Sequence, residues 1–149
     1  MYVDLFRALN EEAVEYVVGG GLALKLHGVQ HAAPDIDLLP APDDANLRRF
    51  LGVAARLKLK LSLPIPLEAL HNVSELDTWA RKRQITALSL QSASPGGMPA
   101  TVIVRPAVPF ERLYRNRVEK DLDGVRLSLA SIEDIEALGQ ARAHPGSSR

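Results

Sequence analysis

Apolar and polar positions along the chain follow two different periods, and each change of period marks a predicted element. Residues 2–15 carry apolar side chains at helical spacing, up to Ala13, which predicts an amphipathic first helix. The apolar run 16–18 predicts a buried strand, which breaks into three glycines before 22–27 resumes with helical character. A polar loop follows, and 35–39 predicts a second strand. The first part of the chain is therefore predicted to run helix, strand, helix, strand.

The rest of the chain is predicted to consist of strands in pairs between helices. Residues 58–63 alternate like a half-exposed edge strand, whereas 64–80, which contains two prolines, is expected to be irregular with short helix. Asp123-Gly124 between two alternating runs is a strong hairpin signal. The other predicted elements are a helix from an Asp43-Asp44 cap to about Ala55, a hairpin of 84–91 and 101–105 with a long loop, a helix over 109–116, and a last helix that the capping box 131–134 opens and that runs to about Ala143.

This order of elements predicts an α+β protein with a mixed β-sheet and helices packed against it. A chain of 149 residues is long enough to bury a hydrophobic core, so a single domain over 1–143 is expected. The last residues, 144–149, are rich in Pro, Gly and Ser and predict a disordered tail.

Two features near the start of the chain carry candidate chemistry. Gly19–Gly21, the glycine turn, stands where a strand passes into a helix, and a helix start offers backbone N–H groups that can hold a phosphate. Asp35 and Asp37 are at i and i+2 of the next strand, so their carboxylates share a face. Paired carboxylates commonly hold Mg²⁺ beside a phosphate. The two features together predict chemistry on a phosphate with a metal ion.

Composition narrows the classes of partner. Acidic and basic residues number 18 each, so no overall field draws the chain to nucleic acid. Basic residues cluster at 81–83 and 105–117, which is most often a solvated face and in some proteins contacts phosphate or RNA. The lack of cysteine excludes disulfides and thiolate metal sites and is typical of a cytoplasmic protein. No apolar run has the length of a membrane span, and no signal-peptide pattern is present, so no membrane contact is expected.

The motif Gly20-Gly21-Leu22-Ala23, followed by His27-Gly28 and by Asp35-Ile36-Asp37-Leu38-Leu39, resembles the DNA polymerase β-like nucleotidyltransferase superfamily. Within it, the sequence is most similar to the AbiEii-type (toxin-like, from toxin–antitoxin pairs) and related minimal bacterial branches. The later segments 109–111 and 131–135 also resemble that family, so the resemblance extends from Leu5 to about Ala143. The glycines alone, or the Asp-x-Asp pair alone, would be a weak signal, and their spacing is more specific.

The resemblance implies a polymerase palm-like fold and the transfer of NMP from NTP to an acceptor, on RNA or on a protein. Gly20 and Gly21 would bind the phosphates. Asp35 and Asp37 would be the catalytic residues and the Mg²⁺ ligands. In the family a third acid on a neighbouring strand completes a site for two Mg²⁺ ions, which activate the attacking oxygen and neutralise the leaving pyrophosphate.

The sequence departs from the family pattern at four positions around that site. The third acid falls at Thr101, and neither predicted strand of the 84–105 hairpin contains Asp or Glu. His31 and Ala33 stand where the family has a basic residue and a threonine, and Gly139 where it often has a lysine. A hydroxyl is a poor Mg²⁺ ligand beside a carboxylate. These departures favour a catalytically degenerate member, a pseudoenzyme, as the alternative to an active enzyme.

Three interpretations of the sequence therefore stay open. The first is a Mg²⁺-dependent nucleotidyltransferase, the second a non-catalytic binder of a nucleotide or a partner protein, and the third an interaction domain, such as a homodimer through the edge at 58–63. If no metal binds, Asp35 and Asp37 are a solvated strand end or a helix-capping pair. His27, directly before Gly28, is predicted to cap or pack rather than to act as a base.

Overall fold

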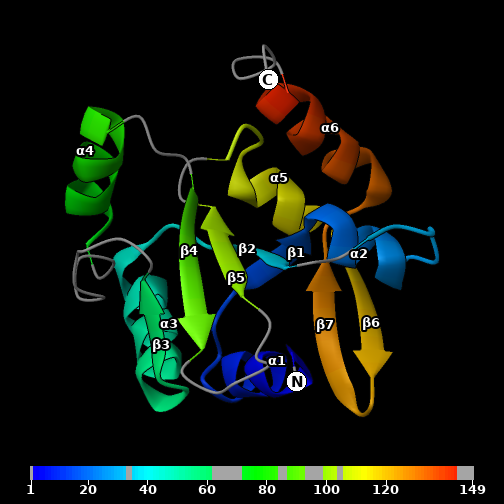
Figure 1. Cartoon of the computed structure of the whole chain (residues 1–149), viewed down its shortest axis with the longest axis horizontal. Coiled ribbons are helices and arrows are strands. Elements are labelled where there is room, and N and C mark those ends of the chain that lie inside the picture. The colour runs from blue at the N-terminus through cyan, green and yellow to red at the C-terminus, as the bar shows by residue number, and fades with distance from the viewer. Residues whose placement is uncertain are drawn as a thin grey trace.

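Helices pack on both faces of a central β-sheet (Figure 1). The computed structural model describes residues 2–32, 35–61, 72–83, 87–92, 99–103 and 106–143. The helices are α1 (Tyr2–Glu11), α2 (Gly20–Leu26), α3 (Asp44–Arg56), α4 (Val73–Arg83), α5 (Phe110–Arg115) and α6 (Ile132–Ala143). The strands are β1 (Tyr16–Gly19), β2 (Ile36–Pro40), β3 (Leu59–Leu61), β4 (Ala87–Ser92), β5 (Ala100–Ile103), β6 (Val118–Leu122) and β7 (Val125–Leu129).

The described strands form one seven-stranded sheet in the order β3-β4-β5-β2-β1-β7-β6. The central strand β2 pairs antiparallel with β1 and parallel with β5, and β1 pairs parallel with β7. The outer pairs, β3 with β4 and β6 with β7, are antiparallel. The predicted α+β class with a mixed sheet and flanking helices is confirmed, and β3 is an edge strand of the described sheet, as the alternation at 58–63 predicts.

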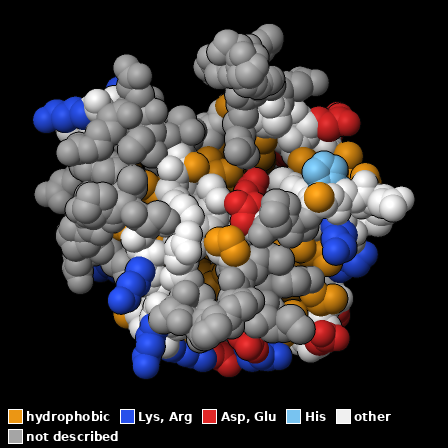
Figure 2. Space-filling view, in the orientation of Figure 1, with side chains coloured by type: hydrophobic (Ala, Val, Ile, Leu, Met, Phe, Trp, Pro, Cys, Tyr) orange, Lys and Arg blue, Asp and Glu red, His pale blue; other side chains and the backbone are white. Residues whose placement is uncertain are grey.

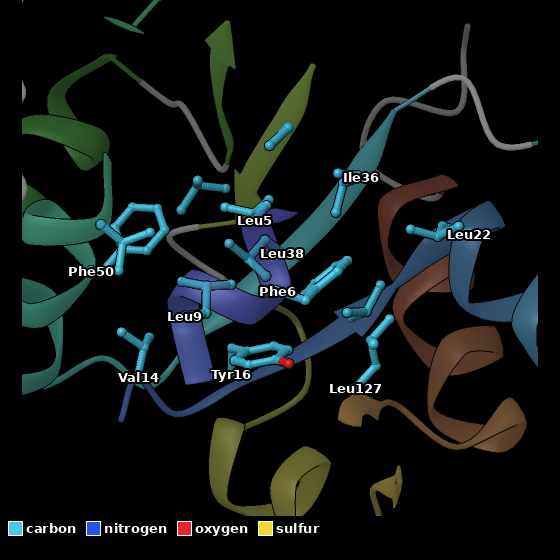
Figure 3. Packing of buried hydrophobic residues seen from close by; sticks show 14 of the residues in the cluster. Leu5, Phe6, Leu9, Val14, Tyr16, Leu22, Ile36, Leu38, Phe50 and Leu127 are labelled. Carbon is cyan, nitrogen blue, oxygen red and sulfur yellow. The ribbon is translucent and has the colours of Figure 1, made fainter. Parts of the chain in front are cut away.

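Alternate side chains of β1 and β2 belong to two different apolar clusters, one on each face of the sheet. The larger cluster contains Val18 and Leu38, and α1 covers it with Phe6 and Leu9 (Figure 3). The Phe6 ring stacks on the Tyr16 ring with 5.7 Å between centroids. The helical spacing of apolar residues in α1 is therefore explained by burial of one face against the sheet.

The smaller cluster lies on the opposite face, where α5 and α6 pack. Val17 and Leu39 contribute from the strands, Leu113 from α5 and Leu138 from α6. Asp37 has the same parity along β2 as Leu39, so its side chain projects from this face. None of the described helices is long and apolar enough to cross a membrane.

One buried amide joins the two site-bearing strands to α3. The side chain of Asn46 is 0 % exposed. Its Nδ2 donates to the carbonyl oxygens of Glu15 (2.9 Å) and Ala41 (3.0 Å), and its Oδ1 accepts from the Glu15 N–H (2.8 Å). Asp43 caps α3, as predicted, because its carboxylate accepts from the Asn46 N–H at 2.8 Å. Asn46 thus joins Glu15, directly before β1, to Ala41, directly after β2.

The β6–β7 hairpin turns at Asp123 and Gly124, as the sequence predicts. Their φ angles are 53° and 81°, and Leu122 pairs with Val125 across the turn. A two-residue loop with positive φ at both positions is the turn that suits the twist of a hairpin.

Two predictions of secondary structure are wrong. The first helix ends at Glu11 rather than near residue 15, because Ala13 has a left-handed φ of 57° and the Val14 N–H turns back to the Leu9 carbonyl (2.9 Å). Residues 73–83 form the regular helix α4, where the sequence predicts irregular structure with at most a helical turn at 76–80. The two prolines that suggest irregular structure, Pro64 and Pro66, precede α4 in the sequence and are not part of it. The predicted loop between β4 and β5 and the tail 144–149 lie outside the described residues, as do the predicted strand ends at 84–86 and 104–105.

We expect Tyr16 to make the protein less stable as pH rises from about 10 to about 12. Burial raises the pKa of its hydroxyl from 10.0 to about 12, and a hydrogen bond with the backbone of Ser128 opposes part of that rise. The unfolded chain loses this proton near pH 10 and the folded chain keeps it to about pH 12. Between these pH values the folded state therefore binds one more proton than the unfolded state. The free energy of unfolding falls across this window by roughly 2 to 3 kcal/mol. Urea unfolding across the window should show a shallower decline for Tyr16→Phe, and equal declines in both proteins would contradict this assignment.

Candidate active site

The glycine turn and the pair of aspartates, Asp35 and Asp37, meet at one end of β1 and β2. Gly19 of β1 pairs with Asp37 of β2, and Gly20 begins α2 directly after Gly19. Paired positions on neighbouring strands project their substituents to the same face of a sheet. The Asp37 carboxylate therefore stands on the face over which the glycine turn passes.

Thr101 lies on the other side of Asp37. The two residues are paired in the parallel ladder of β2 and β5. The hydroxyl Oγ1 of Thr101 donates a hydrogen bond to Oδ2 of Asp35 at 3.0 Å. Both carboxylates and this hydroxyl thus share one face, and Thr101 stands beside the aspartates as the sequence register predicts. Ser89 of β4 pairs with Thr101 and extends the same polar row.

Gly20 contacts Asp37 so closely that a larger residue would not fit. Its φ is +63°, which is left-handed, and a Cβ built on it would lie 2.2 Å from Oδ2 and 2.8 Å from Cγ of Asp37. Glycine is therefore required both by the backbone and by the neighbouring carboxylate. This contact brings the predicted phosphate-binding turn and the predicted metal ligands together.

Gly21 makes a second close contact, with the loop that follows α2. A Cβ on Gly21 would lie 2.2 Å from the carbonyl oxygen of Ala32 and 2.9 Å from Nδ1 of His31. His31 Nδ1 is 2.8 Å from the same carbonyl, to which its N–H donates. The exposed His31 side chain thus lies at the glycine turn, while Ala33 is outside the described residues.

The predicted site residues are accessible from solvent. Asp35, Asp37, Gly20 and Gly21 are each partly exposed. In the view of Figure 2 a group of acidic atoms is visible near the centre of the molecular face. A charged ligand can therefore approach them without opening the core.

His27 has the structural role that the sequence predicts. It is the C-cap of α2, where its backbone N–H donates to the carbonyl of Ala23. Its Nε2 donates to the carbonyl of Ala130 at 2.8 Å, which ties the end of α2 to the residue after β7.

The side chains present suit one Mg²⁺ ion. Mg²⁺ usually takes one or two carboxylates, keeps several waters and completes its shell with substrate phosphates. Asp35 and Asp37 supply two such carboxylates on one face. Within the part of the chain that the structure describes, no group of three or more His, Cys, Asp or Glu side chains could hold a metal. Thr101 adds a hydroxyl but no negative charge, so the described residues could offer carboxylates to one ion but not to two.

An ion pair between α5 and α6, in which only the carboxylate is fully buried, was not predicted from the sequence. Asp134, 0 % exposed, accepts from Nε of Arg112 (3.0 Å) and from Nδ2 of Asn116 (3.2 Å). The Asp134 N–H donates to Oγ of Ser131 (3.1 Å), so the serine half of the predicted capping box is present. The carboxylate that would complete the box binds Arg112 instead. Local spacing carries no signal for this partner, because Arg112 lies on another helix.

Two adjoining cavities lie away from the aspartates, at the opposite end of β2. Their volumes are about 250 Å³ and about 690 Å³, and both are lined by Pro42 and Pro106. Neither is lined by Asp35, Asp37 or the glycine turn. The candidate active site is therefore defined by its polar contacts and not by either of these cavities.

No family model matches the sequence, and no curated protein matches it. Among solved structures, the chain is similar to the crystal structure of a proposed nucleotidyltransferase from Thermotoga maritima. The TM-score is 0.59 over 97 % of this chain and 85 % of that chain, at 15 % sequence identity.

This chain has a nucleotidyltransferase fold. The fold that the resemblance implies is confirmed, and at this identity the likeness shows the fold alone. In this nucleotidyltransferase fold the glycine turn lies between β1 and α2, and the aspartates lie on β2 beside it.

Proposed function

We propose that this chain is a nucleotidyltransferase-like protein that binds an NTP together with Mg²⁺ and transfers its NMP to an acceptor. The observation that carries the proposal is the contact between Gly20 and Asp37. Backbone groups able to face a phosphate and carboxylates able to hold its metal lie directly against each other there. Such convergence is what phosphoryl transfer needs from a protein, because positioning and charge neutralisation supply most of the catalysis.

The residues have separate roles in this proposal. Asp35 and Asp37 hold the metal and orient the triphosphate. Gly20 and Gly21 let the backbone of the turn lie against the carboxylate, so that its N–H groups can bind the phosphates. The bound ion would neutralise negative charge on the phosphates. An acceptor oxygen bonds to the α-phosphorus, the bond from that phosphorus to the bridging oxygen breaks, pyrophosphate leaves, and the acceptor hydroxyl loses a proton.

A second candidate function is binding of a nucleotide without transfer. The hydrogen bond from Thr101 to Asp35 favours it, because a neutral hydroxyl occupies the place beside the aspartates where a third carboxylate would attract a second ion. For the transferase, we also propose that the chain belongs to the AbiEii-type branch of the superfamily and that its acceptor is RNA or a protein.

We expect calorimetry to show that the wild-type protein binds NTPs in the presence of Mg²⁺ or Mn²⁺. The affinity of the Asp35→Asn/Asp37→Asn variant should be lower by a factor of about ten or more, because two charge-assisted contacts are removed. The matched control is Asp121→Asn/Asp123→Asn, which removes two exposed carboxylates with the same spacing at the β6–β7 hairpin. The control should bind like wild type. Equal affinity in all three proteins would rule out the metal role of Asp35 and Asp37.

Incubation with radiolabelled NTPs and total RNA, or with protein acceptors, separates the two candidate functions. Transfer of label by wild type and not by Asp35→Asn/Asp37→Asn supports the transferase. Metal-dependent binding without transfer supports the nucleotide binder. In the latter case, Thr101→Asp adds a carboxylate beside Asp35, and tighter Mn²⁺ binding by that variant would show that the hydroxyl limits the site.

A further inference from the structure

We propose that the groove at the carboxyl ends of β2 and β5 binds an extended segment of a partner protein, in which a basic side chain stands beside apolar or proline residues. The groove consists of the two adjoining cavities of about 250 Å³ and about 690 Å³. The groove lies at the opposite end of β2 from the aspartates, so the proposal does not depend on nucleotide binding.

The described walls of the groove include four prolines and three aromatic side chains. Phe110 and Tyr114 of α5 stack with 5.3 Å between their ring centroids and line the larger cavity. Phe50 and Val73 line the smaller one. Rigid apolar walls of this kind suit an extended or polyproline chain, which loses little conformational entropy on binding. The combined volume is in the range of ordinary ligand sites, roughly 300 to 1,000 Å³.

The charges along the larger cavity are unbalanced. Among the described residues that line it, Glu15, Asp43 and Glu111 are acidic and Arg115 is basic. Across the described residues, carboxylates elsewhere form ion pairs, for example Asp77 with Arg81 and Glu11 with Arg56. No ion pair of the described residues includes Glu15, Asp43 or Glu111. A cationic side chain in the groove would meet three carboxylates, none of which forms an ion pair with another described residue.

The shape of the groove points to a chain segment rather than a compact ion. Pro42 and Pro106 line both cavities, so the apolar compartment lies next to the acidic one. The smaller compartment reaches α4, and the larger one reaches Tyr114 and Arg115 of α5. Neighbouring side chains of one peptide, one apolar and one basic, would fill both compartments together.

A display library of random ten-residue peptides, selected on the full chain, tests this proposal. Selected peptides should be enriched in Arg or Lys next to Pro, Leu or an aromatic residue. When they are resynthesised, their affinity should fall at least about tenfold in Glu15→Gln/Glu111→Gln and should fall as salt is raised. Asp123→Asn/Glu136→Gln removes two exposed carboxylates outside the groove and should bind like wild type.

Each other outcome overturns the proposal. If the selected peptides are not enriched in Arg or Lys, or if both double variants bind them equally well, the carboxylates of the groove do not recognise the ligand. Arginine amide binding as tightly as the peptides would indicate a site for a small cation. A dimer in sedimentation that dissociates in Glu15→Gln/Glu111→Gln would indicate a second copy of the chain as the occupant. Circular dichroism and thermal melts of each variant separate loss of binding from loss of fold.

Discussion

The Asn46→Ala variant is expected to be about 3 kcal/mol less stable than wild type, because truncation leaves buried backbone groups without their partner. Three hydrogen bonds are lost at once, two from Nδ2 and one to Oδ1. The carbonyl of Glu15 keeps one other donor, the Ala41 N–H at 3.0 Å, which limits the loss. Urea unfolding at neutral pH measures the change, with a lower midpoint and an unchanged slope expected.

Asn46→Asp separates hydrogen bonding from packing. The new side chain keeps the shape and the acceptor but turns its second oxygen toward two carbonyl groups. A buried carboxylate in that position is disfavoured in its charged form, so its pKa would be raised. The variant should therefore regain part of the lost stability as pH falls and the carboxyl becomes able to donate.

Arg48→Ala, on the exposed face of α3, is the matched control for these variants. It should change stability by less than about 0.5 kcal/mol. If Asn46→Ala were no more destabilising than Arg48→Ala, the amide would not be what joins the two strands to α3.

Elements with a local cause were predictable from the sequence. Asp123 and Gly124 form their turn because both residues tolerate positive φ, and Asp43 caps α3 because its carboxylate reaches an N–H three residues on. The turn at Ala13 was not predictable in this way. Alanine has no preference for left-handed φ, and the return of Val14 to Leu9 is imposed by packing of the chain into β1.

The candidate site was predictable in its residues but not in its contacts. The spacing of the glycines and aspartates placed them on successive elements. The family resemblance indicates that Thr101 stands beside the aspartates, but no local pattern shows that it donates to Asp35, 66 positions away. The same holds for Asn46 and for the pair of Arg112 with Asp134, since each depends on which strands and helices become neighbours. Long-range polar contacts are set by the sheet order, which periodicity alone does not specify.

The Gly20→Ala variant is expected to lose about 3 kcal/mol of stability, most of it through Asp37. A left-handed φ costs a non-glycine residue roughly 1 kcal/mol. The clash of the new Cβ with Oδ2 and Cγ of Asp37 adds about 2 kcal/mol, a usual cost of overpacking.

A double-mutant cycle isolates that clash. In an Asp37→Ala background, Oδ2 and Cγ are gone and the nearest remaining atom is the Cβ of residue 37, 3.2 Å from the new methyl group. The cost of Gly20→Ala should therefore fall to about 1 kcal/mol, which gives a coupling of about 2 kcal/mol. Gly124→Ala provides the control, because Gly124 also has a positive φ, +81°, but no atom within 4 Å of an added Cβ.

Gly124→Ala should cost the same in both backgrounds, since only the left-handed φ is penalised there. Urea unfolding of the six proteins gives both couplings. If Gly20→Ala cost no more than Gly124→Ala in the wild-type background, the glycine turn would not lie against the carboxylate. The proposal of a shared phosphate and metal site would then lose its structural basis. A coupling confined to Gly20 would instead show that the turn and the acidic pair touch in solution, independently of whether any nucleotide binds.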